Sequence, residues 1–188
     1  MSTHKMITLS VAISFALGSA AAFAAGPNLG KPIAQADFAK WNIDVEPSGA
    51  GLPPGSGTAN QGGSIFAEQC AACHGEGGKG ATMTTSGAPA APAVVSDVRR
   101  NGIDDTTLTM KNYWPYATTL FDYIRRSMPW TSPRSLTDDQ VYALTAYILA
   151  QNHLIDAKEV INAQTLPKVK MPNRDGFIPR FPERMPHH

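Results

Sequence analysis

The segment Cys70-Ala71-Ala72-Cys73-His74 holds the residues whose types and spacing indicate chemistry most directly. A C-x-x-C-H pattern is the attachment motif of a c-type haem. The two thiols add to the vinyl groups of the haem, and the adjacent imidazole binds the iron. One helical turn is enough to bring both sulfurs to one porphyrin edge. We therefore expect a single covalent haem c, bound through Cys70 and Cys73, with His74 as an iron ligand.

A redox disulfide and half of a zinc site are the alternatives for a C-x-x-C pair. The chain has only 2 cysteines, and both lie in this motif, so a zinc site would need histidines to complete it. The remaining histidines do not have the spacing of a zinc set; they are His4, His153, His187 and His188.

The first 24 residues indicate export. His4 and Lys5 give a basic start, residues 6–17 are mostly apolar, and Ala22-Phe23-Ala24 offers a cleavage site. The apolar run is shorter than the roughly 20 residues that span a bilayer, which favours a cleaved signal peptide over a membrane anchor. We expect a periplasmic protein whose mature chain has no transmembrane segment. Export suits the haem motif, because this type of haem attachment takes place outside the cytoplasm.

The composition describes a small core with long irregular segments. Acidic and basic residues number 15 and 16, and this balance gives no indication of nucleic-acid binding. The 16 glycines and 15 prolines break regular structure over long stretches. We divide the chain into a signal peptide (1–24), a Pro/Gly-rich extension (25–60), a haem domain (61–152) and a tail (153–188) that starts with a short helix.

Apolar periodicity and capping signals predict helices over residues 36–41, 61–72, 117–127, 138–152 and 156–163. The second of these runs into the haem motif and places Ile65 and Phe66 in the core. The fourth begins with the capping box of Thr137 and Gln140. Its buried stripe comprises Val141, Leu144, Tyr147 and Ile148. Segments expected to be irregular or extended are 49–57, 75–102 and 165–188.

The iron needs a second protein ligand or an open site. Met128 is favoured, because it follows the predicted helix 117–127 and precedes Pro129, which fixes the backbone beside it. Met83 follows His74 too closely to pass round the haem edge. Met110, Met171 and His153 stay open as alternatives.

This arrangement over residues 61–152 resembles the class I cytochrome c family. The resemblance implies an all-α fold around one covalent haem, with the first and last helices packed crosswise and one haem edge exposed. It further implies that Ile65 and Phe66 meet Leu144, Tyr147 or Ile148. A proline carbonyl, that of Pro92 or, as the weaker match, Pro89, is implied to accept a hydrogen bond from the His74 ring.

A narrower resemblance rests on longer stretches: residues 49–57, the run W-P-Y-A-T-T-L-F-D-Y-I at 114–124, and residues 166–177. Together they are similar to the cytochrome subunit of periplasmic Sox-type sulfur and sulfite dehydrogenases. The resemblance implies a molybdenum-containing partner subunit that supplies electrons, and a downstream acceptor such as another cytochrome. The chain departs from larger members by having one haem motif.

Several side chains near Met128 have two readings each. Arg126 is a candidate partner for a haem propionate, and otherwise a solvated charge at a helix end. Trp130 is a candidate wall of the haem pocket. The proline-rich tail either wraps the domain or docks on a partner, and we expect that removing residues 165–188 leaves the haem site intact.

A non-catalytic electron-transfer subunit is the function that these features favour. The alternatives are a carrier for another periplasmic dehydrogenase and a haem enzyme acting directly on a small substrate. A cysteine-ligated iron is excluded if both thiols hold the haem.

Overall fold

The computed structural model describes residues 30–81, 89–99, 102, 104–178, 180 and 181. The chain divides at Asn42 into two units. In the first unit, helix α2 (Gln35–Trp41) confirms the expected short helix, and none of its residues is buried. The expected signal peptide, Met83 and the two terminal histidines lie outside the described residues.

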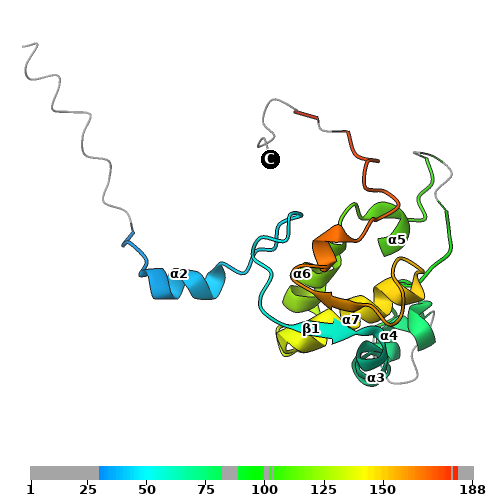
Figure 1. Cartoon of the computed structure of the whole chain (residues 1–188), viewed down its shortest axis with the longest axis horizontal. Helices are drawn as coiled ribbons and strands as arrows, with labels where there is room; N and C mark the ends of the chain where they lie inside the picture. The colour runs from blue at the N-terminus through cyan, green and yellow to red at the C-terminus, as the bar shows by residue number, and fades with distance from the viewer. Residues whose placement is uncertain (1–29, 82–88, 100–101, 103, 179, 182–188) are drawn as a thin grey trace, which may run out of the picture. The chain divides into compact units, whose positions relative to one another are not determined.

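Helices are the main regular elements of the second unit, which starts at Ile43 (Figure 1). They are α3 (Ala59–Gln69), α4 (Ala71–His74), α5 (Met110–Tyr113), α6 (Ala117–Ser127) and α7 (Asp138–Gln151), with short 3₁₀ turns at Glu76–Gly78 and Leu166–Lys168. Two short strands, β1 (Ser56–Thr58) and β2 (Val160–Asn162), form an antiparallel pair. The expected all-α class is confirmed, with this small sheet as an addition. No helix among the described residues is long and apolar enough to cross a bilayer.

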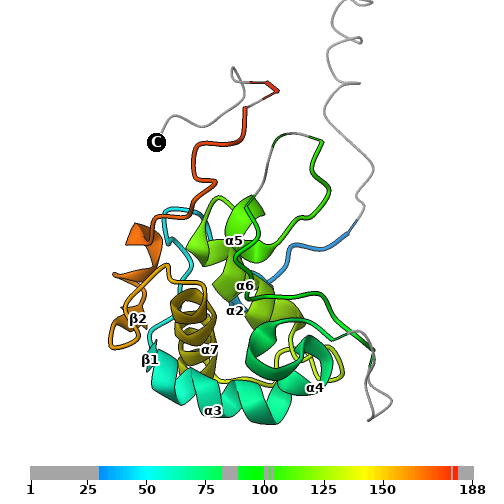
Figure 2. The ribbon, with the colours of Figure 1, turned by 90° about the vertical axis from the view of Figure 1, so that its right-hand side faces the viewer.

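Helices α3 and α7 lie crosswise and in close contact (Figures 1 and 2). Gly62 marks the crossing point, because a Cβ atom there would overlap the carbonyl group of Ala143. One turn later the rings of Phe66 and Tyr147 pack with centroids 5.1 Å apart. The predicted crossing of the first and last helices is therefore present, and glycine permits it by removing the side chain where the backbones meet.

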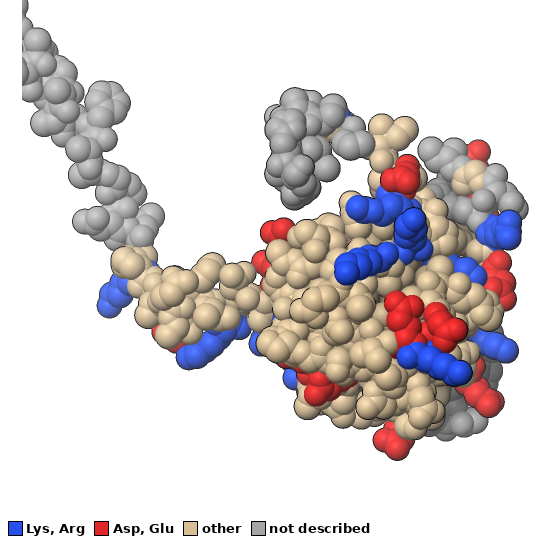
Figure 3. Space-filling view, viewed as in Figure 1, with Lys and Arg blue, Asp and Glu red and all other residues tan. Residues whose placement is uncertain are grey.

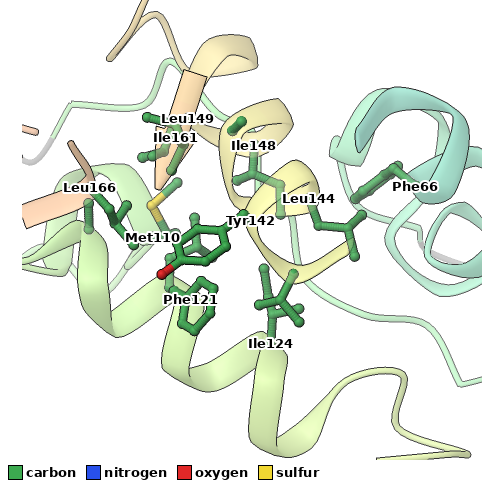
Figure 4. Packing of buried hydrophobic residues seen from close by; sticks show 14 of the residues in the cluster. Phe66, Met110, Phe121, Ile124, Tyr142, Leu144, Ile148, Leu149, Ile161 and Leu166 are labelled. Carbon is green, nitrogen blue, oxygen red and sulfur yellow. The ribbon is translucent and has the colours of Figure 1, made fainter. Parts of the chain in front are cut away.

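The core lies between α6, α7 and the chain that follows α7 (Figure 4). Tyr142, Leu149 and Phe121 have no exposed surface, so α7 is buried over more of its circumference than the predicted stripe. Tyr142 and Phe121 pack with ring centroids 4.4 Å apart. The segment after α7 adds Ile161 and Leu166, both fully buried, to this core.

Two sequence-based expectations are wrong. Residues 156–163 form turns and strand β2 instead of a helix, and β1 extends into the glycine-rich segment 49–57. Both strands are only three residues long, and their register depends on a partner about a hundred positions away, which local periodicity cannot show. Of the two alternatives for the tail, packing on the domain applies to its first part, because Leu166 and Met171 belong to the core.

Candidate functional site

Helix α3 delivers the haem motif to the site. It starts earlier than predicted, at a capping box in which Thr58 accepts the amide of Gln61 and the Gln61 side chain accepts the amide of Thr58. It ends at Cys70, whose φ of −120° breaks the helix, and α4 then restarts for a single turn that ends at His74. The predicted continuous helix 61–72 is thus two helices, and the break lies at the first cysteine.

The His74 imidazole is held by the loop that follows it. Its Nδ1 atom lies 3.0 Å from the carbonyl oxygen of Pro92, so Nδ1–H donates to that oxygen in the tautomer that leaves Nε2 free for a metal. The expected contact with Pro92, and not with Pro89, is present. The amide of Ala91 donates to the Cys73 carbonyl over 3.0 Å, which ties the same loop back to the motif. The centroid of the Phe66 ring, which belongs to the core, lies 6.5 Å from that of the imidazole.

Asn152 anchors this loop to the end of α7, and sequence reasoning did not identify it. Its side chain has no exposed surface. Its Nδ2 group donates to the carbonyls of Val94 and Ile148, each over 2.8 Å, and its Oδ1 atom accepts the amide of Ser96 over 3.1 Å. An asparagine directly after a helix is common at helix ends, so no local signal indicated that this side chain would form hydrogen bonds with a distant loop.

The candidate methionines occupy different environments. Met110 and Met171 are 6% and 3% exposed and belong to the hydrophobic core. Figure 4 shows Met110 beside Tyr142 and Leu166. Met128 instead ends α6, is only partly buried, and its amide closes the last turn on Ile124 over 3.0 Å. Packing thus accounts for the two buried methionines, and the assignment of Met128 as iron ligand stays a prediction.

Arg126 has carboxylate partners of its own. Its Nε donates to Asp122 over 2.8 Å and its Nη2 to Asp44 over 2.6 Å, and these bonds raise the pKa of the guanidinium further. A propionate would have to share or displace these partners. Trp130 is 66% exposed, so any wall that it provides lies at the rim of a pocket. Both roles toward a haem remain predictions.

Both cysteines have free thiols and are partly buried. Burial, followed by the proximity of Cys73, raises the pKa of Cys70 to about 11. No cluster of three or more His, Cys, Asp or Glu side chains that could hold a metal ion is found among the described residues. Two accessible thiols beside an imidazole whose Nδ1 is already bonded fit a haem c, with Cys70 and Cys73 as attachment points and His74 as ligand.

A hollow of about 1140 Å³ lies between the segment 97–102, helix α5 and the tail, and the haem motif does not line it. At its edge Lys111 donates to Asp97 over 3.1 Å, and this bond lowers the pKa of the carboxyl.

The sequence profile of the cytochrome c family matches residues 59–152, which is half of the chain. The chain belongs to the cytochrome c family. The protein therefore carries a covalently bound haem c, and its matched span begins at the first residue of α3 and ends at Asn152.

Among solved structures, this cytochrome is similar to a chain of the sulfane dehydrogenase SoxCD from Paracoccus pantotrophus. The two share 32% sequence identity with a TM-score of 0.71, over 85% of this chain and 75% of that one. No curated protein matches the cytochrome. The similarity to SoxCD agrees with the resemblance read from residues 49–57, 114–124 and 166–177.

Proposed function

We propose that this cytochrome is the periplasmic electron-transfer subunit of a molybdenum-dependent sulfur or sulfite dehydrogenase. It accepts electrons from the molybdenum subunit and passes them to a downstream acceptor such as another cytochrome. The observation that carries the proposal is the similarity to a chain of SoxCD over 85% of the cytochrome, well beyond the 59–152 span that any cytochrome c domain would explain.

The site residues have defined roles in this proposal. Cys70 and Cys73 fix the haem, His74 and Met128 bind its iron, and the Pro92 carbonyl sets the orientation of the His74 ring through Nδ1. When bound, the haem supplies one-electron redox chemistry at a potential that a methionine ligand raises. In this proposal the chain itself performs no oxidation of a sulfur compound, because its single haem takes up one electron at a time. Oxidation of sulfite or sulfane sulfur removes at least two electrons, and both thiols are used in attachment.

Surface charge suits docking at short range. The formal net charge is +1, and Figure 3 shows acidic and basic side chains interspersed with broad uncharged areas on the face in view. A protein without a large single-sign field gains little from long-range steering. Shape and apolar contact therefore dominate recognition in this proposal.

Copurification from the native periplasm tests the proposal. The cytochrome should elute with a second polypeptide in a fraction that contains both iron and molybdenum. In a stopped-flow experiment, sulfite or a sulfane donor should reduce the haem only when that polypeptide is present. Rapid turnover of sulfite by the isolated cytochrome with an artificial acceptor would instead support a haem enzyme.

A further inference from the structure

Helix α2 presents large apolar side chains that no described part of its own unit covers. Every residue from 31 to 42 is exposed. Trp41 is 75% exposed, Ile33 58% and Phe38 43%. Phe38 and Trp41 lie one turn apart and share a face with Ala34, whereas the ion pair of Lys40 and Asp37, 2.9 Å long, lies away from it. The segment is therefore a short amphipathic helix with two aromatic residues on its apolar face.

A seven-residue helix of this kind needs a partner. Isolated helices shorter than about 12 residues are marginal in water, so the stability of α2 must come from burial of its apolar face. Aromatic side chains held in pockets are the residues that most often dominate a protein interface. In many complexes an amphipathic helix binds in an apolar groove of its partner, which buries the apolar face of the helix and places its aromatic side chains in pockets.

We propose that α2 is a docking arm that binds an apolar groove of the dehydrogenase subunit through Phe38 and Trp41. This inference rests on the proposed function. The similarity to a SoxCD chain covers 85% of this chain. Residues 43–188 alone make up a smaller share of the chain, so the similarity extends into the first unit, which contains α2. A segment shared with a chain of a two-protein complex favours the partner subunit over a second copy of the cytochrome as the occupant.

Binding of the full-length cytochrome to the purified dehydrogenase subunit tests the arm. The double variant Phe38→Asp/Trp41→Asp should raise Kd at least tenfold and leave the haem spectrum and the unfolding midpoint unchanged. The matched control is Leu108→Asp, because Leu108 is 48% exposed but lies outside α2. In the wild type, Trp41 fluorescence should shift to the blue on mixing with the subunit.

The outcomes separate the two proposals. If the wild type binds and is reduced but the double variant keeps its affinity, the arm is wrong and the proposed function stands. If the blue shift appears with the cytochrome alone and depends on its concentration, the occupant is a second copy. If the wild type neither binds nor is reduced, the proposed function itself is overturned, and the arm with it.

A second inference is independent of any partner: the structure assigns Asn152 as a positioning residue for the haem-binding histidine. Asn152 holds Val94 and Ser96, and the Val94 and Val95 amides donate to the Gly78 carbonyl over 2.8 and 2.9 Å. The Pro92 carbonyl that accepts from His74 lies two residues before this clamp. Fixing residues 94–96 therefore fixes the acceptor of the His74 ring proton.

Exchange of the His74 Nδ1 proton, measured by NMR in the reduced protein, tests this role. Asn152→Ala should speed that exchange at least tenfold and shift the reduction potential. The matched control is Asn112→Ala, because Asn112 is also nearly buried and its Nδ2 also clamps a loop, at the Val98 and Thr107 carbonyls. Equal acceleration in both variants at matched stability would overturn the assignment.

A milder variant covers the case in which Asn152→Ala does not fold. Asn152→Ser adds no charge and retains a hydroxyl that can donate to the Ile148 carbonyl, but it is too short to hold both Val94 and Ser96. It should give an exchange rate between those of the wild type and Asn152→Ala. An exchange rate equal to that of the wild type would show that Asn152 has no influence on His74.

Discussion

Tyr142 is a single residue whose burial makes the stability of the domain depend on pH. It has no exposed surface, and its hydroxyl donates to the Pro53 carbonyl over 2.8 Å. Burial, followed by the negative charge of Asp138, raises the pKa of Tyr142 from 10.0 to about 12. Because the folded state keeps the phenol protonated where the unfolded state loses the proton, stability should fall as pH rises from 10 to 12.

The substitution Tyr142→Phe separates the hydrogen bond from the titration. At pH 7 we expect a loss of about 1 kcal/mol, the typical contribution of one such bond. Above pH 10 the wild type should lose up to about 1.4 kcal/mol per pH unit from this group, and the variant should not. Denaturant unfolding at pH 7, 10 and 11 measures both effects, and parallel pH profiles would show that another group controls the alkaline loss.

Methionine substitutions distinguish a ligand from core residues. Met128→Ala should abolish the weak charge-transfer band of methionine-ligated iron(III) with a small effect on folding. Met110→Ala should retain the band and destabilise the domain by about 2–5 kcal/mol, as expected for a buried methionine. Spectra and urea unfolding of the two variants give the comparison. Loss of the band in Met110→Ala alone would reassign the ligand.

At the scale of elements, the crossing of α3 and α7 depends on one of two adjacent glycines. A Cβ at Gly62 would overlap the backbone of Ala143, whereas a Cβ at Gly63 would meet the Tyr147 ring at 3.4 Å, an ordinary contact. Alanine gains about 1 kcal/mol over glycine in a helix. Gly62→Ala should therefore destabilise the domain by several kcal/mol, since the helices must separate, and Gly63→Ala should be neutral or stabilising.

Thermal unfolding of the two glycine variants measures this difference. Both change the same residue type in the same helix, so helix propensity cancels in the comparison. Similar midpoints for the two variants would mean that the crossing tolerates a methyl group.

Long capped helices were predictable from the sequence, and close approaches were not. The span of α6 and the Thr137 cap of α7 follow from prolines and a capping box, which are local signals. The break at Cys70, the 3-residue strands and the Asn152 clamp depend on contacts between distant segments. For the site, the motif identified Cys70, Cys73 and His74, whereas the contact with Pro92 required the family resemblance.

At the scale of the whole molecule, the tail is divided into a structural part and an exposed part. Leu166 and Met171 are 0% and 3% exposed, and the Asn173 side chain donates to the Tyr113 carbonyl over 2.6 Å. Farther along, Ile178 is 94% exposed. Removal of residues 165–188 therefore empties part of the core. The expectation that the haem site stays intact without these residues stays a prediction.

A truncation and a substitution test this division. Deleting residues 165–188 should lower the free energy of unfolding by at least about 3 kcal/mol, since two buried apolar side chains are lost. The substitution Ile178→Ala, at a side chain that is 94% exposed, should leave it unchanged within about 0.5 kcal/mol. Urea titrations monitored by the haem spectrum measure both, and equal stabilities would show that the segment 165–178 contributes nothing to the core.

The pairing of β1 with β2 also sets an order of events in time. Closing a loop of about a hundred residues costs conformational entropy before it returns any contact. The contacts that compensate this cost depend on α7, because Gly57 of β1 lies against Ala143. The strand pair should therefore form after α3 and α7 dock and open before they part, so that amide hydrogens in β2 exchange faster than those of α7. Until β1 and β2 pair, the two cysteines of the haem motif lie in a partly assembled domain. This leaves an interval in which the haem can be attached before the strand pair completes the fold.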